Sequence, residues 1–234
     1  MGFSIKHKIL FNHRSIMKLT KFAQSCFLLE DAGQKTLIDP GYIQVDEKAI
    51  QAWMHPDFIL VTHKHQDHFD EESVKKILSP KTRIFATKET ASFKPNTKFE
   101  ILKEGEKITL GKVKVEVVRS IHGYHPGLKG GKEVNEGVGF IIDTEKKKIY
   151  HTGDTICFNN NYKCNILLLP FNNHGVVMGP FEAAMFAKET GAELVIPIHY
   201  DNPALPADIL RLEKELTKNS LTYKFLKIGE SIEV

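Results

Sequence analysis

Cysteine is scarce in this chain of 234 residues, which has only Cys26, Cys157 and Cys164. An odd number of cysteines without metal-knuckle spacing excludes a disulfide framework and indicates free thiols, so we expect a reducing, cytoplasmic location. Long apolar runs are also missing, because the longest strongly apolar stretch covers only residues 166–171. A membrane span needs roughly 18 such residues, and we therefore expect no membrane partner.

Excess charge of either sign is absent as well. The chain has 32 Lys and Arg against 29 Asp and Glu, a formal net charge of +3. This balance argues against nucleic acid as a partner and against a polybasic membrane anchor. We find no Pro/Ser linker, low-complexity tract or short repeat. We therefore expect one domain over residues 17–234, preceded by an extension, residues 1–16, that lacks the apolar core of a secretory signal.

Short apolar runs separated by turn signals predict a strand-rich fold with a few helices. Asp46 and Asp70 are suited to cap two helices, Gly179-Pro180 begins a third, and a fourth carries Ile209. Both halves have several strands followed by a helix, which favours a two-layered β core with helices outside. The predicted strands are 18–22, 26–30, 35–39, 58–62, 83–86, 107–110, 112–119, 138–143, 148–151, 166–169, 193–198 and 223–227.

Histidine is the residue type that stands out, with eleven in the chain and three within six residues. The segment Thr62-His63-Lys64-His65-Gln66-Asp67-His68 directly follows a predicted buried strand. Imidazole and carboxylate groups are suited to divalent Zn, Fe and Mn. Alternate residues of a strand-exit turn point the same way, so His63 and His65 can share one ion while Asp67 and His68 face another.

Three more ligand-type residues follow predicted strands in the same manner: His122, Asp154 and His199. Asp154 lies in the sequence Gly153-Asp154-Thr155, and His199 closes the sequence Pro197-Ile198-His199. Strand ends that run into loops are where such folds place their chemistry. These positions strengthen the prediction of a metal site.

The order of these motifs resembles the metallo-β-lactamase superfamily, over nearly the whole chain from Met17 on. Ser25-Cys26-Phe27, Leu37 to Gly41, Met178-Gly179-Pro180 and Ile196 to Tyr200 are similar to one branch, the metal-dependent hydrolases near the ascorbate-6-phosphate lactonases. The resemblance implies an α/β fold, a four-layer αββα sandwich with a two-metal site at one edge. It implies one site of His63, His65 and His122, a second of Asp67, His68 and His199, and Asp154 as the bridge, with Asp39 orienting a ligand imidazole.

The resemblance also implies a mechanism, in which a hydroxide bridging two divalent ions attacks an ester, lactone or phosphodiester of a small molecule. Zn is the first expectation for the metal, with Mn or Fe as alternatives. Asp67 counts as a catalytic residue as well as a ligand. His174 and Tyr200 are the candidate proton donors, with His125 a weaker one.

Two departures from the branch affect the expected substrate. Ala23-Gln24-Ser25 stands where the branch has Gly-His-Ser, and Asn172-Asn173-His174-Gly175 stands where it has Gly-Gly-Asn. The Gly-rich segment 122–139 carries Lys129 and Lys132. It is equally consistent with a loop that closes over an anionic substrate and with a surface excursion, and the sequence leaves homo-oligomer formation open.

Other functions remain open at this stage. A single-iron thiol dioxygenase uses the same scaffold with fewer protein ligands, and Asp67 and His68 argue for the second site instead. A metal-loaded binding protein without catalysis is a further alternative. An RNase-Z-type nuclease shares the ligand pattern, but a basic arm for RNA is not evident in the sequence. An exported β-lactamase and a flavodiiron protein fit less well, because neither a signal nor a flavin domain is visible.

Overall fold

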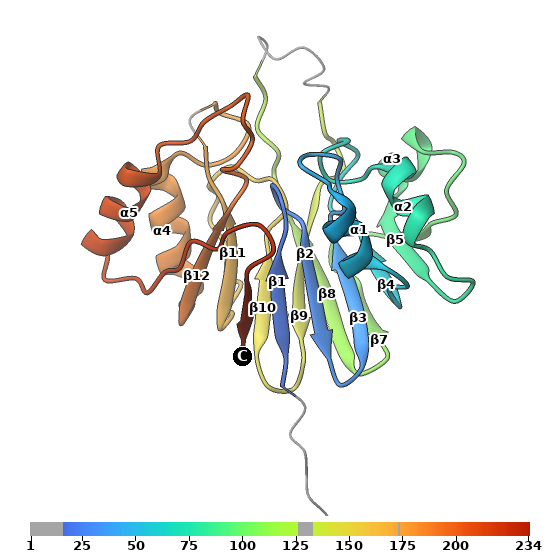
Figure 1. Ribbon diagram of the computed structural model, residues 1–234. Helices are drawn as coiled ribbons and strands as arrows, with labels where there is room; N and C mark the ends of the chain where they lie inside the picture. The colour runs from blue at the N-terminus through green and yellow to red at the C-terminus, as the bar shows by residue number, and fades with distance from the viewer. Residues whose placement is uncertain (1–15, 126–132, 173) are drawn as a thin grey trace, which may run out of the picture.

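The structure is a computed structural model that describes residues 16–125, 133–172 and 174–234. Two mixed β-sheets pack face to face at its centre (Figure 1). The first sheet has the strand order β13-β1-β2-β3-β4-β5-β6, in which β3, β4, β5 and β6 run parallel. Its strands are β1 Lys18–Lys21, β2 Phe27–Asp31, β3 Gln34–Ile38, β4 Phe58–Leu60, β5 Arg83–Thr87, β6 Glu100–Leu102 and β13 Ser231–Glu233.

The second sheet has the strand order β12-β11-β10-β9-β8-β7. Its antiparallel part is built from hairpins, and β10, β11 and β12 run parallel. Its strands are β7 Lys107–Leu110, β8 Val113–Arg119, β9 Val138–Asp143, β10 Lys148–His151, β11 Ile166–Pro170 and β12 Leu194–Ile198.

Helices cover the outer faces of the two sheets (Figure 1). Buried residues of α1 and α2 pack against the outer face of the first sheet, and α3 lies beside β5 and β6. Buried residues of α4 and α5 pack against the outer face of the second sheet. The helices are α1 Glu47–Trp53, α2 Glu71–Ile77, α3 Lys88–Phe93, α4 Pro180–Thr190 and α5 Ile209–Lys218. The layer order is therefore α/β/β/α, as the sequence predicts.

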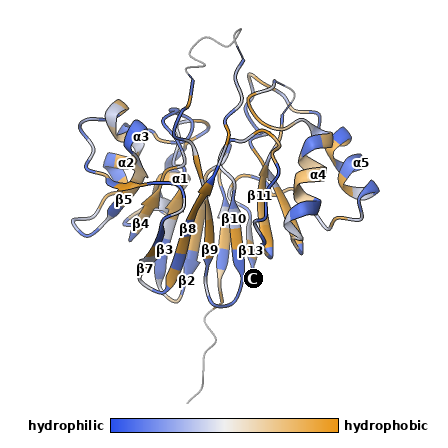
Figure 2. Ribbon diagram, turned by 180° about the vertical axis from the view of Figure 1, so that it is seen from behind, coloured by the Kyte–Doolittle hydropathy of each residue, from blue (hydrophilic) through white to orange (hydrophobic). Residues whose placement is uncertain are grey.

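The main hydrophobic core lies between the sheets and follows from the two-residue period of the strands. On β8, Val113, Val115 and Val117 are buried, while Lys114 is exposed on the other face. Figure 2 shows apolar colour concentrated along the strands and polar colour at the hairpin ends. At about 25 cal/mol for each Å² of buried apolar surface, this layer supplies much of the drive for folding. Among the described residues, no helix is both long and apolar enough to cross a membrane.

Most of the predicted elements are present, and the predicted helix caps are confirmed. Asp46 and Asp70 accept hydrogen bonds from the backbone N–H groups of Ala49 and Ser73, and α4 begins at Pro180. The closing strand predicted at 223–227 is wrong, because only an isolated bridge joins Tyr223 to Val195. The last strand is instead β13, which pairs antiparallel with β1.

Candidate metal centre

The predicted ligands lie at one edge of the two sheets, where several strands end. The segment after β4 supplies His63, His65, Asp67 and His68, and the segment after β8 supplies His122. Asp154 follows β10, and His199 follows β12. The ligand atoms form three overlapping groups, each within 4.8 Å: His63, His65 and His122; His63, His68 and Asp154; and Asp67, His68 and His199.

The first group consists of three imidazoles in edge-to-face contact. His63 Nε2 lies 3.1 Å from His65 Nδ1. The ring centroids of His65 and His122 are 4.8 Å apart, and those of His63 and His122 are 5.0 Å apart. Three ring nitrogens that converge in this manner form a donor set suited to a borderline divalent ion such as Zn²⁺.

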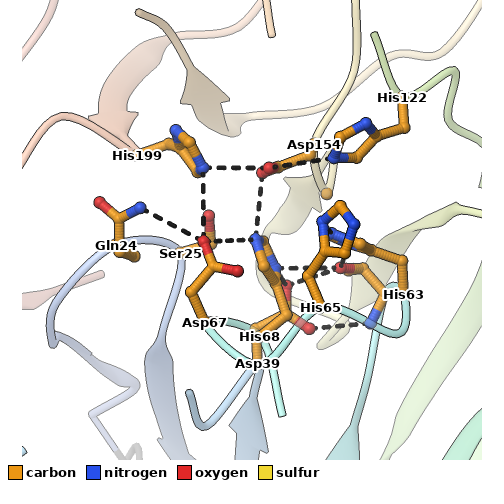
Figure 3. A network of polar contacts seen from close by, with 12 residues as sticks. Gln24, Ser25, Asp39, His63, His65, Asp67, His68, His122, Asp154 and His199 are labelled. Carbon is orange, nitrogen blue, oxygen red and sulfur yellow. Dashed lines mark hydrogen bonds and ion pairs between the residues drawn. The ribbon is translucent and has the colours of Figure 1, made fainter. Parts of the chain in front are cut away.

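Around the third group, of Asp67, His68 and His199, two carboxylates alternate with two imidazoles in a closed ring that includes Asp154 (Figure 3). His199 Nε2 lies 3.0 Å from Asp154 Oδ2 and 3.7 Å from Asp67 Oδ2. His68 Nε2 lies 3.3 Å from Asp154 Oδ1 and 3.8 Å from Asp67 Oδ2. His122 Nε2 approaches Asp154 Oδ2 at 3.7 Å from the other side. The carboxylate of Asp154 therefore stands between the two groups of ligands.

A buried layer of hydrogen bonds holds the imidazoles from behind. Asp39 accepts from the Thr62 backbone N–H at 2.8 Å, from Thr62 Oγ1 at 2.7 Å, and pairs with His68 Nδ1 at 2.7 Å. Thr62 Oγ1 also lies 3.0 Å from His63 Nδ1. His122 Nδ1 lies 2.6 Å from the Gly123 carbonyl oxygen. These contacts occupy Nδ1 of three imidazoles and leave Nε2 to face the centre of the site.

Burial and neighbouring charges shift the pKa values in the site in opposite directions. Burial, helped by His68, holds the pKa of His63 well below its ordinary value. Burial also acts to lower the pKa of His68, but Asp154 and Asp39 outweigh it and raise the pKa well above its usual range. For His199 the same competition, again won by Asp154, raises the pKa to about 10. The neighbouring carboxylates thus stabilise positive charge on the rings of His68 and His199.

Two buried atoms that lack hydrogen-bond partners indicate that the donor atoms fit a metal ion. His68 Nε2 and Asp154 Oδ1 are fully buried and have no hydrogen bond of acceptable geometry within the described structure. Buried polar atoms are rarely left without a partner. Two such atoms that face each other at 3.3 Å, among imidazole and carboxylate donors only, are explained by a cation between them.

The structure leaves the proposed proton donors outside this ring. The Tyr200 hydroxyl donates to the Leu226 carbonyl oxygen at 2.6 Å, so its proton points to the backbone. The role of Tyr200 as a proton donor stays a prediction, and this contact does not favour it. His174 is partly buried, its backbone N–H donates to Asn172 Oδ1, and its Nε2 has no hydrogen-bond partner in the described part of the chain.

Two residues without a predicted role, Thr62 and Gln24, contact the candidate ligands. Thr62 bonds Asp39 and His63, and its position directly before the histidine cluster is the signal that could have revealed it. Gln24 was noted only as a departure from the branch, yet its Nε2 donates to Asp67 Oδ2 at 3.4 Å. His125 is exposed at the edge of the described chain, and Lys129 and Lys132 lie outside the described residues.

His151, which shares a strand end with Asp154, has a structural role. Its Nε2 lies 2.7 Å from the Ser25 carbonyl oxygen, and its Nδ1 accepts from the Gly153 backbone N–H at 3.2 Å. Both ring nitrogens are therefore occupied by backbone groups, as the neutral imidazole allows.

Comparisons with known proteins identify the family of this chain. The beta-lactamase superfamily domain matches residues 18–199. A UPF0173 metal-dependent hydrolase of Methanoculleus marisnigri is 32% identical over 233 residues, which cover 93% of this chain and 97% of the relative. Another, of Korarchaeum cryptofilum, is 30% identical over 236 residues, with 94% and 100% covered.

A solved structure supports the fold independently. The metallo hydrolase Igni18 of Ignicoccus hospitalis matches with a TM-score of 0.77 at 21% identity, covering 94% of this chain and 98% of that one. At this identity the likeness shows the fold alone, and the similarity to ascorbate-6-phosphate lactonases stays a prediction. The domain match and the two relatives, which span nearly the whole chain, lead to one conclusion. The chain belongs to the beta-lactamase superfamily, among the UPF0173 metal-dependent hydrolases.

Proposed function

We propose that this protein is a dinuclear metal-dependent hydrolase that cleaves an ester, lactone or phosphodiester bond in a small molecule. The observation that carries the proposal is the position of Asp154. Its Oδ1 faces His68, and its Oδ2 faces both His199 and His122. One carboxylate thus joins two sets of ligands, which is the arrangement that holds two ions side by side.

His63, His65 and His122 would hold one ion, and Asp67, His68 and His199 the other. Bound there, divalent ions supply a water of lowered pKa as nucleophile and polarise the oxygen of the bond under attack. The imidazole and carboxylate donors are suited to Zn²⁺ first, and to Mn²⁺ or Fe²⁺ as alternatives.

Residues of the protein orient the ligand rings and supply a proton. Asp39 and Thr62 fix the rings of His68 and His63, so the donor atoms need little rearrangement when they bind. Cleavage also needs a proton on the leaving group. His174 is the proposed donor, because its Nε2 has no hydrogen-bond partner in the described structure. The residue belongs to the segment that follows β11.

A hydrolysis screen tests the proposal. Wild-type protein, purified without chelator and supplied with Zn²⁺, Mn²⁺ or Fe²⁺, is assayed on esters, lactones and phosphodiesters. We expect turnover of at least one class, abolished by His65→Ala with the fold intact. His174→Gln should lower kcat and leave metal content unchanged, while the exposed His55→Gln serves as the matched control. Binding without turnover across the panel would contradict the proposal and favour the non-catalytic alternative.

A further inference from the structure

Lys21, the last residue of β1, is a fully buried lysine. Its ammonium donates to the Phe22 carbonyl oxygen at 2.7 Å and pairs with the carboxylate of Asp201. It also lies 5.0 Å from the centroid of the Tyr200 ring. Lysine is almost never fully buried unless it is paired, and the partner of Lys21, Asp201, is itself only partly exposed.

Asp201 connects this buried cation to the segment that carries His199. One carboxylate oxygen contacts Lys21, and the other accepts the backbone N–H of Gln24 at 2.6 Å. The carbonyl oxygen of Asp201 accepts from Gln44 Nε2 at 2.6 Å. Asp201 stands two residues after His199, so these bonds fix the turn immediately beyond that imidazole.

Gln24 carries the connection to two ligand residues. Its backbone carbonyl oxygen accepts the His199 backbone N–H at 3.2 Å, and its side-chain Nε2 donates to Asp67 Oδ2 at 3.4 Å. Figure 3 shows the Gln24 side chain next to Asp67, with His199 on the same side of the site. The same Oδ2 atom faces His68 and His199. Asp201 is therefore linked through Gln24 to both Asp67 and His199.

The backbone at both ends of this connection adopts an unusual conformation. Gln24 has φ 55° and His199 has φ 61°, in the left-handed region that residues other than glycine rarely populate. Such conformations persist only where the surroundings hold them. Two hydrogen bonds join these two turns directly, from the Gln24 N–H to Asp201 and from the His199 N–H to the Gln24 backbone carbonyl oxygen, and Lys21 pairs with the same Asp201 carboxylate.

We propose that Lys21 and Asp201 are positioning residues, which hold His199 and Gln24 so that Asp67, His68 and His199 can bind one of the two metal ions. This inference rests on the proposed dinuclear function. It assigns a specific dependence, because in the first group His63 is held by Thr62 and His122 by the Gly123 carbonyl oxygen. Removal of the pair should weaken one metal site and spare the other.

The decisive variant is Lys21→Met, which removes the cation and keeps a long apolar side chain. Zn²⁺ binding is measured by chelator competition on the full chain. We expect one of the two sites to lose at least tenfold in affinity and the other to remain within twofold. In the metal-free protein, we expect faster amide hydrogen exchange at His199, since its N–H bond to Gln24 loses support.

Two further variants separate positioning from general stability. Lys146→Met breaks an ion pair with the buried carboxylate of Asp31, at the far end of β2, and should leave both zinc affinities unchanged. Because an unpaired buried charge can prevent folding, the double variant Lys21→Met with Asp201→Asn removes both charges together. It should show the same selective loss of one zinc site.

The outcomes are distinguishable. Two zinc ions bound equally well by wild type and by both Lys21 variants would overturn the inference and leave the proposed function standing. A similar loss at both sites, matched by Lys146→Met, would also overturn it, since a stability effect would then suffice. Failure of the wild type to bind two ions would count against the proposed function itself.

Discussion

His68 pairs through Nδ1 with the buried carboxylate of Asp39, with 2.7 Å between Nδ1 and Oδ2. Both side chains are fully shielded from solvent. The contact determines which nitrogen of the ring faces the site, because Nδ1 is occupied and Nε2 is left to face Asp154. Metal-binding histidines commonly have a carboxylate partner of this type, which fixes the tautomer and the ring orientation.

The change Asp39→Asn tests this relationship. We expect metal affinity to fall about 10- to 100-fold, because the amide holds the His68 ring less firmly and in a different tautomer. Chelator competition measures the loss. Asp57→Asn is the control, since Asp57 is an exposed carboxylate that accepts the Lys35 backbone N–H far from the ligands. Equal affinities of wild type and Asp39→Asn would contradict the orienting role.

Gly41 allows the close approach on which the Asp67 segment depends. A Cβ added at Gly41 would lie 1.8 Å from the Asp67 carbonyl oxygen. Gly41→Ala should therefore displace Asp67 and reduce the bound metal. Gly105→Ala is the control, because Gly105 has φ +87° but nothing within 4 Å of an added Cβ. It should cost about 1 kcal/mol in unfolding free energy from backbone strain and keep its full metal content.

Lys64, between His63 and His65, is buried and pairs with Glu89 at 2.6 Å. Glu89 also accepts the backbone N–H groups of Asn135 and Glu136, each at 3.0 Å. Glu89→Gln should therefore increase amide hydrogen exchange at residues 135–136 and leave metal content unchanged. The exposed Glu100→Gln, which breaks the pair with Arg83, should leave that exchange at the wild-type rate.

Stability of the metal-free protein should depend on pH through His151. Burial lowers the pKa of His151, whose two ring nitrogens contact backbone groups. In the unfolded chain the imidazole takes up a proton near pH 6.5, whereas in the folded protein it does so only at lower pH. The contribution of His151 to the unfolding free energy should consequently fall as the pH drops below about 6.5.

Urea titrations at pH 7.5 and pH 5 measure this fall, and it should be smaller in His151→Gln. His63 and His122, whose pKa values are lowered largely by burial, act in the same direction, whereas His68 and His199, whose pKa values are raised by carboxylates, act in the opposite one. These contributions remain in the variant, so the comparison of wild type with His151→Gln isolates the part due to His151. An identical pH dependence in wild type and variant would exclude His151 as a contributor.

The sequence predicted the fold well where local patterns are strong. The apolar run 58–62 reads as a strand buried on both faces, and β4 does lie between the parallel strands β3 and β5. The prediction failed near the C-terminus, where Tyr223 to Lys227 has the composition of a strand. Only Tyr223 makes a bridge there, and β13 pairs instead with β1, at the other end of the chain. A pairing over that sequence separation leaves no local signal.

The meeting of the candidate ligands in one place could be predicted, because each of them follows a strand and strand ends gather at one edge of a sheet. The hydrogen bonds behind the ligands could not. Asp201 bonds Gln24 across 177 residues, and nothing in either segment identifies the other as its partner. Tyr200 is a similar case. Its position next to His199 suggests a proton donor, but the sequence does not show that its hydroxyl donates to the Leu226 carbonyl oxygen.

Metal stoichiometry tests the central claim most directly. Mass spectrometry is applied to wild-type protein purified without chelator or histidine tag, and to His65→Ala and Asp154→Ala. The proposed two-ion site predicts about two Zn, Mn or Fe per chain in the wild type, with a loss in His65→Ala and the larger loss in Asp154→Ala, whose carboxylate contacts both ligand groups. A single iron per chain would redirect the assignment to thiol oxidation, and no metal after reconstitution would contradict it outright.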